Sequence, residues 1–250
     1  MKIGILETGE VHPDLKARHG DYPAMFAARL GAIDPSLEFA VVRVVSGQMP
    51  ASPDQADGWL VTGSRHGVYD GLPWIAPLAA FLRDCVARGV PVVGICFGHQ
   101  LLAEALGGRA VKSDRGWALG VQDYEVVARP AWMADLPDRF AVGAFHQDQV
   151  VALPQGATVL ARSAQCDYAA LAYGDPDHPD AISIQPHPEY NAAFLDDLIV
   201  LRAGTSYPAD LAAPARASVT RAVHNDVWMR MIANFLREAA AKRQTAAAAS

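Results

Sequence analysis

Cys96 lies in a segment whose residue types suit a reactive thiol. The valine-rich apolar run 90–95 meets the pentapeptide Gly94-Ile95-Cys96-Phe97-Gly98, and a segment with leucines at helical spacing follows. This pattern predicts a strand, a sharp turn and a helix, with Cys96 at the turn. The two glycines remove side chains that would clash where strand and helix approach each other. A thiol at a helix N-terminus is stabilised as the thiolate, so we expect Cys96 to be a nucleophile.

A cysteine nucleophile needs a base and a group that orients the base, and His187 and Glu189 are the candidates. They flank Pro188 directly after the apolar segment 181–185. The restricted backbone would aim both side chains at one place, where the carboxylate can hold the imidazole in one tautomer. Taken singly, they also fit a surface turn histidine and a carboxylate favoured by a helix dipole. Together with the cysteine turn, they predict a Cys96–His187–Glu189 triad.

The segments that must position Cys96 alternate between strands and helices. Apolar runs at 2–6, 39–45, 59–62 and 90–95 predict buried strands, and apolar stripes predict helices at 23–30 and 74–88. This order is typical of a parallel sheet with helices on both faces, whose ligands bind at the carboxyl ends of the strands. Thr62-Gly63-Ser64 and Cys96 both lie at such ends, so we expect them to face one pocket.

The second half of the chain has a different pattern. Its short segments rich in Val, Ala and Tyr, separated by Gly, Pro and Asp, predict antiparallel strands at 109–112, 119–127, 140–145, 157–163 and 168–173. A buried strand at 181–185 and helices at 190–202, 208–222 and 225–241 follow. We therefore expect one α/β domain over residues 1–241, with a central, mostly parallel sheet and a small antiparallel β subregion. Residues 242–250 are Ala-rich and are expected to form a flexible tail.

Composition narrows the classes of partner and location. The net charge is −6 and no run of Lys and Arg occurs, so we expect no nucleic-acid partner. The three cysteines have no Cys-x-x-Cys spacing, which argues against disulfides or zinc and favours a reducing, cytoplasmic setting. Cys85 falls on the apolar stripe of its helix, and Cys166 has no turn of this kind. Residues 2–6 reach the acidic Glu7 quickly, so they predict a strand and not a signal peptide, and no apolar segment is long enough to span a membrane.

Two motifs together resemble a known family. The segments Gly94-Ile95-Cys96-Phe97-Gly98-His99-Gln100 and Gln185-Pro186-His187-Pro188-Glu189 closely resemble those of the class I (triad) glutamine amidotransferases. The resemblance implies the three-layer fold of that family. It also implies that Cys96 attacks the side-chain amide carbon of glutamine, that His187 passes a proton to the departing ammonia, and that Glu189 orients His187. Water would then hydrolyse a γ-glutamyl thioester.

The resemblance extends to residues around the nucleophile. Thr62-Gly63-Ser64 matches the family's oxyanion loop, which implies that the N–H groups of Gly63 and Phe97 hold the developing oxyanion. Gln100 matches a position that contacts substrate, although a polar residue also suits the first turn of a helix.

A further segment, Phe145-His146-Gln147-Asp148-Gln149-Val150, matches the lining of the glutamine pocket. The resemblance therefore implies that His146, Gln147 and Asp148 bind substrate, although a histidine at a strand end more often has a structural role than a catalytic one. With Leu153-Pro154, this segment looks most like the free-standing branch that includes plant γ-glutamyl peptidases and GMP-synthase-like domains.

The chain also departs from the synthetases of this family. It has no Gly-x-x-x-x-Gly-Lys-Ser/Thr phosphate loop and no second domain of synthetase size, so nothing in it activates an acceptor with ATP. Glutaminase chemistry therefore predicts a synthetase partner on another chain that receives the ammonia, with no cofactor and no metal. Three alternatives remain open: a stand-alone γ-glutamyl peptide or amide hydrolase, a non-catalytic binding or regulatory module, and a redox-sensing cysteine for which His187 would be dispensable.

Overall fold

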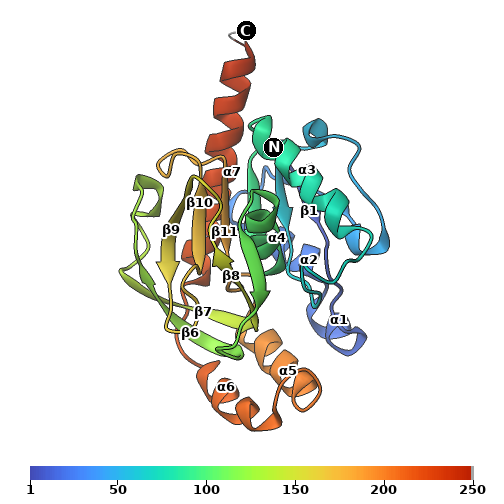
Figure 1. Cartoon of the computed structure of the whole chain (residues 1–250), viewed down its shortest axis with the longest axis vertical. Helices are drawn as coiled ribbons and strands as arrows, with labels where there is room; N and C mark the ends of the chain where they lie inside the picture. The colour runs from blue at the N-terminus through green and yellow to red at the C-terminus, as the bar shows by residue number, and fades with distance from the viewer. Residues whose placement is uncertain (249–250) are drawn as a thin grey trace.

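One continuous sheet of nine strands runs through the computed structural model, which describes residues 1–248 (Figure 1). The spatial order of its strands is β2-β1-β3-β4-β11-β10-β9-β6-β7, and a separate two-stranded sheet pairs β5 with β8. The strands are β1 (Lys2–Leu6), β2 (Glu38–Val42), β3 (Gly58–Val61), β4 (Val92–Ile95), β5 (Arg109–Lys112), β6 (Ala118–Val126), β7 (Arg139–His146), β8 (Asp148–Ala152), β9 (Ala157–Arg162), β10 (Ala170–Tyr173) and β11 (Ala181–Ile184).

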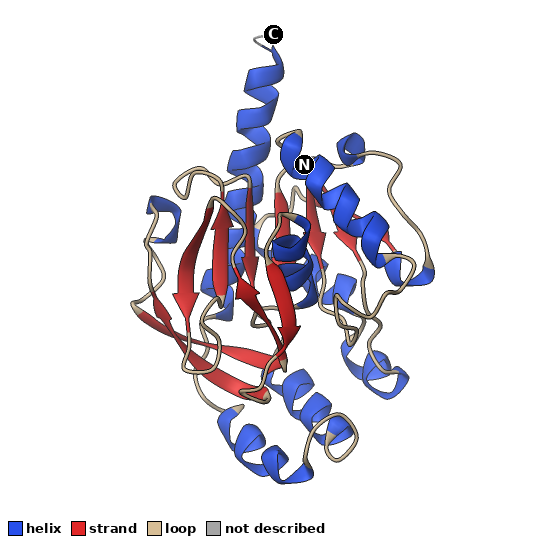
Figure 2. Ribbon diagram, in the orientation of Figure 1, coloured by secondary structure: helices blue, strands red, loops and turns tan. Residues whose placement is uncertain are grey.

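Helices cover both faces of this sheet (Figure 2). They are α1 (Pro13–His19), α2 (Tyr22–Ile33), α3 (Ile75–Ala87), α4 (Phe97–Ala105), α5 (Ala192–Arg202), α6 (Ala212–Ser218) and α7 (Asn225–Ala248). Short 3-10 helices lie at η1 (Val44–Ser46), η2 (Pro53–Gln55), η3 (Ala131–Met133) and η4 (Ala209–Leu211). Figure 1 shows α3 and α4 in front of the sheet and α7 behind it.

The parallel half of the sheet brings the predicted site segments to one edge. Strands β2, β1, β3, β4 and β11 are parallel neighbours. Val61 of β3 lies opposite Gly94 of β4, and Ile184 of β11 lies opposite Ile95 of β4. The carboxyl ends of these three strands are therefore level, and the residues that follow them meet at the same edge of the sheet.

Alternation along the strands divides the core between the two layers of helices. Val93 and Ile95 of β4 pack in one cluster with side chains of α2 and α7, whereas Val92 packs with α3 and α4. Successive side chains of a strand point to opposite faces, which explains why Val92, Val93 and Ile95 of β4 are all apolar and buried. The expected α/β class, a central sheet between helical layers with an antiparallel part, is confirmed.

The antiparallel strands extend the same sheet. β10, β9, β6 and β7 continue it from β11, and only β5 and β8 form a separate ribbon. The helices α5 and α6 lie near the ends of β6 and β7, at the bottom of Figure 1.

Several element bounds differ from those predicted. Residues 13–19 form helix α1 where a loop was expected, because His12 caps a helix that begins at Pro13. The predicted strand 39–45 ends at Val42 and is followed by η1, and the predicted helix 208–222 is reduced to η4 and α6. Strand β8 was not predicted. Helix α7 continues past the predicted end at 241 to Ala248, since alanine has the highest helix propensity. The last two residues of the predicted tail lie outside the described part of the chain.

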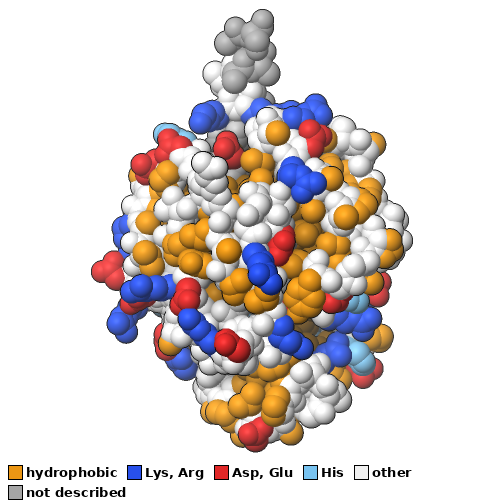
Figure 3. Space-filling model, in the orientation of Figure 1, with side chains coloured by type: hydrophobic (Ala, Val, Ile, Leu, Met, Phe, Trp, Pro, Cys, Tyr) orange, Lys and Arg blue, Asp and Glu red, His pale blue; other side chains and the backbone are white. Residues whose placement is uncertain are grey.

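The surface mixes charges of both signs. In Figure 3, basic and acidic side chains are interspersed over the face shown. Within residues 1–248, no helix combines the length and the apolar character needed to cross a bilayer.

Candidate active site

Cys96 sits between β4 and α4 in a strained backbone conformation. Its φ of 52° and ψ of −101° make it the one non-glycine residue with positive φ in the described chain. Such a conformation costs free energy and persists only where the surrounding structure imposes it. Cys96, 5% exposed, stands at the N-terminus of α4. The cysteine turn predicted from sequence is therefore present.

The two glycines around Cys96 are required by close backbone contacts. A Cβ atom at position 94 would lie 2.5 Å from the carbonyl oxygen of Gly98, and one at position 98 would lie 2.6 Å from the carbonyl oxygen of Val61. Real Cβ contacts are essentially never this short. The backbone of the turn therefore packs closely against α4 and against strand β3, and these contacts fix the position of Cys96.

His187 and Glu189 follow β11, the strand next to β4. The backbone N–H of His187 donates to the carbonyl oxygen of Gly143 at 2.8 Å, and its Nδ1 lies 2.7 Å from Oε1 of Glu189. Both side chains are almost fully buried. Because Glu189 accepts a hydrogen bond from Nδ1, the carboxylate fixes the tautomer and leaves Nε2 free for proton transfer.

An aromatic ring supports the imidazole on one face. The rings of His187 and Tyr190 stack with centroids 4.1 Å apart and an angle of 4° between their planes. The sequence analysis did not identify this role of Tyr190, and a ring three residues after the histidine was the only available signal.

The charges around His187 favour its imidazolium form. Burial alone would lower the pKa of His187, but the charges of Glu189 and Cys96 and hydrogen bonds to both outweigh burial and raise the pKa to about 10. The other two thiols have no such partners. Burial raises the pKa of Cys85 and of Cys166 to about 12, so both remain protonated near neutral pH.

The loop after β3 lies against both members of the cysteine–histidine pair. A Cβ atom on Gly63 would lie 2.9 Å from Cε1 of His187 and 3.6 Å from Cβ of Cys96. Gly63 is thus close enough for its backbone to face a group bound to Cys96. Phe97 is the first residue of α4, so its N–H has no partner within the helix.

Hydrogen bonds from the loop after β1 fix the orientation of the Gly63 loop. The hydroxyl of Thr8 lies 2.9 Å from the carbonyl oxygen of Thr62 and 3.2 Å from that of Gly63. The hydroxyl of Ser64 in turn donates to the carbonyl oxygen of Thr8 at 2.7 Å. The sequence analysis missed Thr8, although its place at the carboxyl end of a parallel strand could have indicated it.

The four expected substrate-binding residues lie together at the other side of Cys96. The side-chain amide of Gln100 donates to the carbonyl oxygen of Asp148 at 2.9 Å. Nδ1 of His146 lies 3.2 Å from the same carbonyl oxygen, and the carboxylate of Asp148 accepts from the hydroxyl of Tyr69 at 2.8 Å. The amide of Gln147 donates to the carbonyl oxygen of Ser113 at 3.4 Å.

His146 is a neutral histidine with a free acceptor. Burial, aided by the nearby His187, lowers the pKa of His146 to about 3. Its Nδ1–H donates to the carbonyl oxygen of Asp148, and its Nε2 is buried without a partner among the described residues. Burial also raises the pKa of Asp148.

Cys96 and the four expected substrate-binding residues line one cavity of about 440 Å³. It is lined by Ser64, Arg65, His66, Gly67, Tyr69, Asp70, Cys96, Gln100, Lys112, Trp117, Phe145, His146, Gln147, Asp148, Arg202 and Ser206. Ligand pockets of drug-sized molecules have this range of volume. The cavity therefore holds the thiol and all four expected substrate-binding residues.

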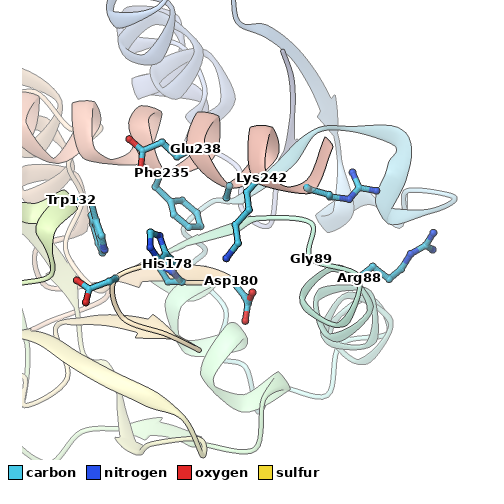
Figure 4. A pocket seen from close by; sticks show the side chains of 12 residues that line it. Arg88, Gly89, Trp132, His178, Asp180, Phe235, Glu238 and Lys242 are labelled. Atoms are coloured by element: carbon cyan, nitrogen blue, oxygen red, sulfur yellow. The ribbon is translucent and has the colours of Figure 1, made fainter. Parts of the chain in front are cut away.

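A larger cavity, of about 520 Å³, lies elsewhere. Figure 4 shows Phe235 and Lys242 of α7 above it, with Trp132 and His178 at its side. None of the predicted site residues lines this cavity, and it contains no nucleophile beside a base. Among the described residues, no cluster of three or more His, Cys, Asp or Glu side chains is placed to hold a metal ion.

Comparisons with known proteins agree with this geometry. Residues 38–200 match the sequence model of a family described as glutamine amidotransferase class-I. Gamma-glutamyl peptidase 4 of Arabidopsis thaliana is 29% identical over 231 residues, which cover 89% of this chain and 90% of the relative. One subunit of the glutamine-hydrolyzing GMP synthase of Halobacterium salinarum is 32% identical over 153 residues, 61% of this chain and 77% of the relative.

Solved structures resemble the whole fold. A glutamine amido transferase from Methylobacillus flagellatus superimposes with a TM-score of 0.74 at 22% identity, covering 95% of this chain and 94% of the other. A glutamine amidotransferase from Thermotoga maritima gives a TM-score of 0.69 at 19% identity, with coverage of 94% and 98%.

Proposed function

Because the chain belongs to the class I glutamine amidotransferase family, we propose that it is a thiol enzyme that cleaves γ-glutamyl amide bonds with Cys96 as the nucleophile. One observation carries the proposal. Cys96, whose backbone is strained, and His187 both lie against Gly63, and the imidazole of His187 is hydrogen-bonded to the buried carboxylate of Glu189. A nucleophile, a base and a group that orients the base are the parts that acyl transfer requires.

In the proposed first step, the Cys96 thiolate attacks the γ-carbonyl carbon of the substrate. The N–H groups of Gly63 and Phe97 stabilise the oxyanion, an interaction worth about 3 to 4 kcal/mol for one donor in enzymes of this type. The imidazolium of His187 gives its proton to the departing nitrogen as the C–N bond breaks. The γ-glutamyl group is then held as a thioester.

In the second step, His187 accepts a proton from water, which attacks the thioester. The S–C bond breaks, glutamate leaves, and Cys96 returns to the thiolate. Glu189 orients His187 and stabilises the imidazolium in both steps.

The glutamyl half of the substrate is assigned to the side of the cavity formed by Gln100 and residues 146–148. The neutral ring of His146 lines that side of the cavity, with its Nε2 buried. The carboxylate of Asp148 is at the same end of the cavity, and its negative charge suits the α-ammonium group of a glutamyl residue.

Glutamine and γ-glutamyl peptides both fit this chemistry. Likeness to one subunit of a glutamine-hydrolyzing GMP synthase supports glutamine as the substrate, with ammonia passed to a synthetase partner on another chain. Likeness to γ-glutamyl peptidases, which extends over nearly the full length of both chains, supports a stand-alone hydrolase.

Two assays test the proposal. Ammonia release from glutamine and glutamate release from a γ-glutamyl dipeptide are measured for the wild type and for Cys96→Ala. We expect turnover of at least one of these substrates and its loss in the variant. Equal turnover in wild type and variant would contradict the triad, and no turnover of either substrate would favour a binding module. A redox-sensing thiol would instead react with peroxide in a His187→Ala variant as fast as in the wild type.

A further inference from the structure

The cavity of Cys96 adjoins a second, smaller cavity. A space of about 110 Å³ lies under the loop of residues 9–13, and it shares Arg65, His66 and Arg202 with the cavity that holds the thiol. These three side chains therefore form a wall with the catalytic cavity on one side and the small cavity on the other. We call this small space the outer cavity. A substrate that reaches from the catalytic cavity to these three side chains and into the outer cavity would be larger than glutamine.

Both arginines of the wall are held at their backbones by local structure. Arg65 follows the Gly63 loop, which the hydroxyls of Thr8 and Ser64 fasten to the end of β1. Arg202 is in the last turn of α5, where the helix dipole favours a cation. The N–H of Ser206 donates to the carbonyl oxygen of Arg202 at 3.0 Å and closes the turn after the helix.

The side chains of Arg65 and Arg202 have no hydrogen-bond or ion-pair partner among the described residues. Some other arginines are paired: Arg115 makes two hydrogen bonds to Asp167, and Arg216 makes two to Asp196. The exposed Arg109, Arg139 and Arg230 line neither cavity. Unpaired guanidinium groups in a cavity suit a carboxylate, which they can bind with two parallel hydrogen bonds.

Two acidic side chains, Asp70 and Glu10, line the same two cavities as the arginines. Asp70 accepts from the N–H of Gly67 at 3.0 Å and lies 3.7 Å from the ring of His66. Glu10 is the one carboxylate that lines the outer cavity, against two arginines. On the opposite side, Lys112 and Asp148 are register partners in β5 and β8, and these two residues of opposite charge both line the cavity.

We infer that the leaving-group side of the catalytic cavity binds an anion, so the preferred substrate is a γ-glutamyl amino acid or peptide whose leaving group carries a free carboxylate. This inference rests on the proposed function. Ammonia, the leaving group from glutamine, is small and carries no negative charge, so it does not require two unpaired arginines. The S–C bond to Cys96 forms first and gives the tetrahedral oxyanion, and the amide C–N bond breaks when this intermediate collapses. His187 supplies the proton to the amine, and the carboxylate of the departing amino acid stays on Arg65 and Arg202 until release.

Two substrates that differ only in this charge test the inference. γ-Glutamylglycine and its C-terminal amide share the glutamyl half and the scissile bond, and kcat/KM is measured for each. We expect the wild type to prefer the free acid by about ten-fold or more, since hydrogen bonds between charged groups carry this much energy. In Arg65→Gln and Arg202→Gln the preference should fall towards equality. The ratio is measured within each variant, so it does not depend on the fraction of folded enzyme.

Matched variants separate a local effect from a general one. Arg230→Gln removes an exposed arginine of α7 that lines neither cavity, and its preference should equal that of the wild type. Glu10→Gln removes the opposing carboxylate and should increase the preference for the free acid. Equal kcat/KM for acid and amide in the wild type would overturn the inference while the proposed function stands. An unchanged ratio in both arginine variants would also overturn it. If neither compound nor glutamine is cleaved, the proposed function and this inference both fail.

Discussion

Replacing Glu189 with glutamine tests how the buried carboxylate controls His187. The substitution keeps the size of the side chain and removes one negative charge at the end of a 2.7 Å hydrogen bond. An opposite charge about 4 Å away is worth about 4 kcal/mol at the effective dielectric constant of a protein, which corresponds to about three pH units. The loss of this charge should therefore make the imidazolium of His187 much easier to deprotonate.

The sign of the effect follows from the role of His187 as the proton donor. Its pKa is raised to about 10 in the wild type, so kcat/KM should stay level from pH 7 to 9 and fall as the pH rises through about 10. In Glu189→Gln the alkaline limb should move down by about three pH units, which lowers kcat/KM about 100-fold at pH 9 and less than about two-fold at pH 6.

The assay is a pH profile of kcat/KM for whichever γ-glutamyl substrate turns over best. Glu104→Gln is a matched control, because it removes a carboxylate of α4 that accepts a hydrogen bond from the N–H of Ala110. Its alkaline limb should stay with that of the wild type. A Glu189→Gln profile with the wild-type alkaline limb, or one lowered by the same factor at every pH, would refute this account of the carboxylate.

Two further predictions concern the Gly63 loop and the thiol of Cys96. In Gly63→Ala, the new Cβ would lie 2.9 Å from a ring carbon of His187, so the ring must shift and kcat/KM should fall by about 100-fold with circular dichroism unchanged. With iodoacetamide at neutral pH, Cys96 should be alkylated while Cys85 and Cys166 stay unmodified, because burial raises the pKa of both of these thiols to about 12; peptide mass spectrometry reads the result.

Both predictions have a comparison within the chain. Gly31→Ala adds a methyl group inside α2 at an ordinary contact distance of 3.7 Å from Phe39, and it should leave kcat/KM unchanged. A Gly63→Ala enzyme as active as Gly31→Ala would show that the close approach of this loop to His187 has no functional consequence. Alkylation of Cys85 or Cys166 as fast as Cys96 would contradict the assignment of a uniquely reactive thiol.

The sequence predicted the parts of the fold that depend on local pattern. Continuous apolar runs such as 92–95 are typical of strands buried on both faces, and the cysteine turn follows from two glycines spaced around Cys96. Their positions at the carboxyl ends of neighbouring parallel strands then follow from topology. This is why the segments that carry Cys96, Gly63 and His187 could be expected at one edge of the sheet.

Features that depend on contacts between distant segments could not be predicted in this way. Thr8 acts on a loop more than fifty residues away, and no local pattern indicates which carbonyl its hydroxyl meets. Strand β8 pairs directly with β5, although β6 and β7 lie between them in the sequence. The wall of Arg65 and Arg202 joins the loop after β3 to the end of α5, and their lack of a partner is a property of the folded surface alone.

Covalent trapping tests the central claim most directly. The enzyme is incubated with a glutamine analogue that carries an electrophilic carbon in place of the side-chain amide, and the labelled peptide is identified by mass spectrometry. We predict one adduct per chain on Cys96, no adduct in Cys96→Ala, and protection by a γ-glutamyl substrate. An adduct on Cys85 or Cys166, or none on a folded protein, would contradict the assignment of Cys96 as the nucleophile that attacks γ-glutamyl amides.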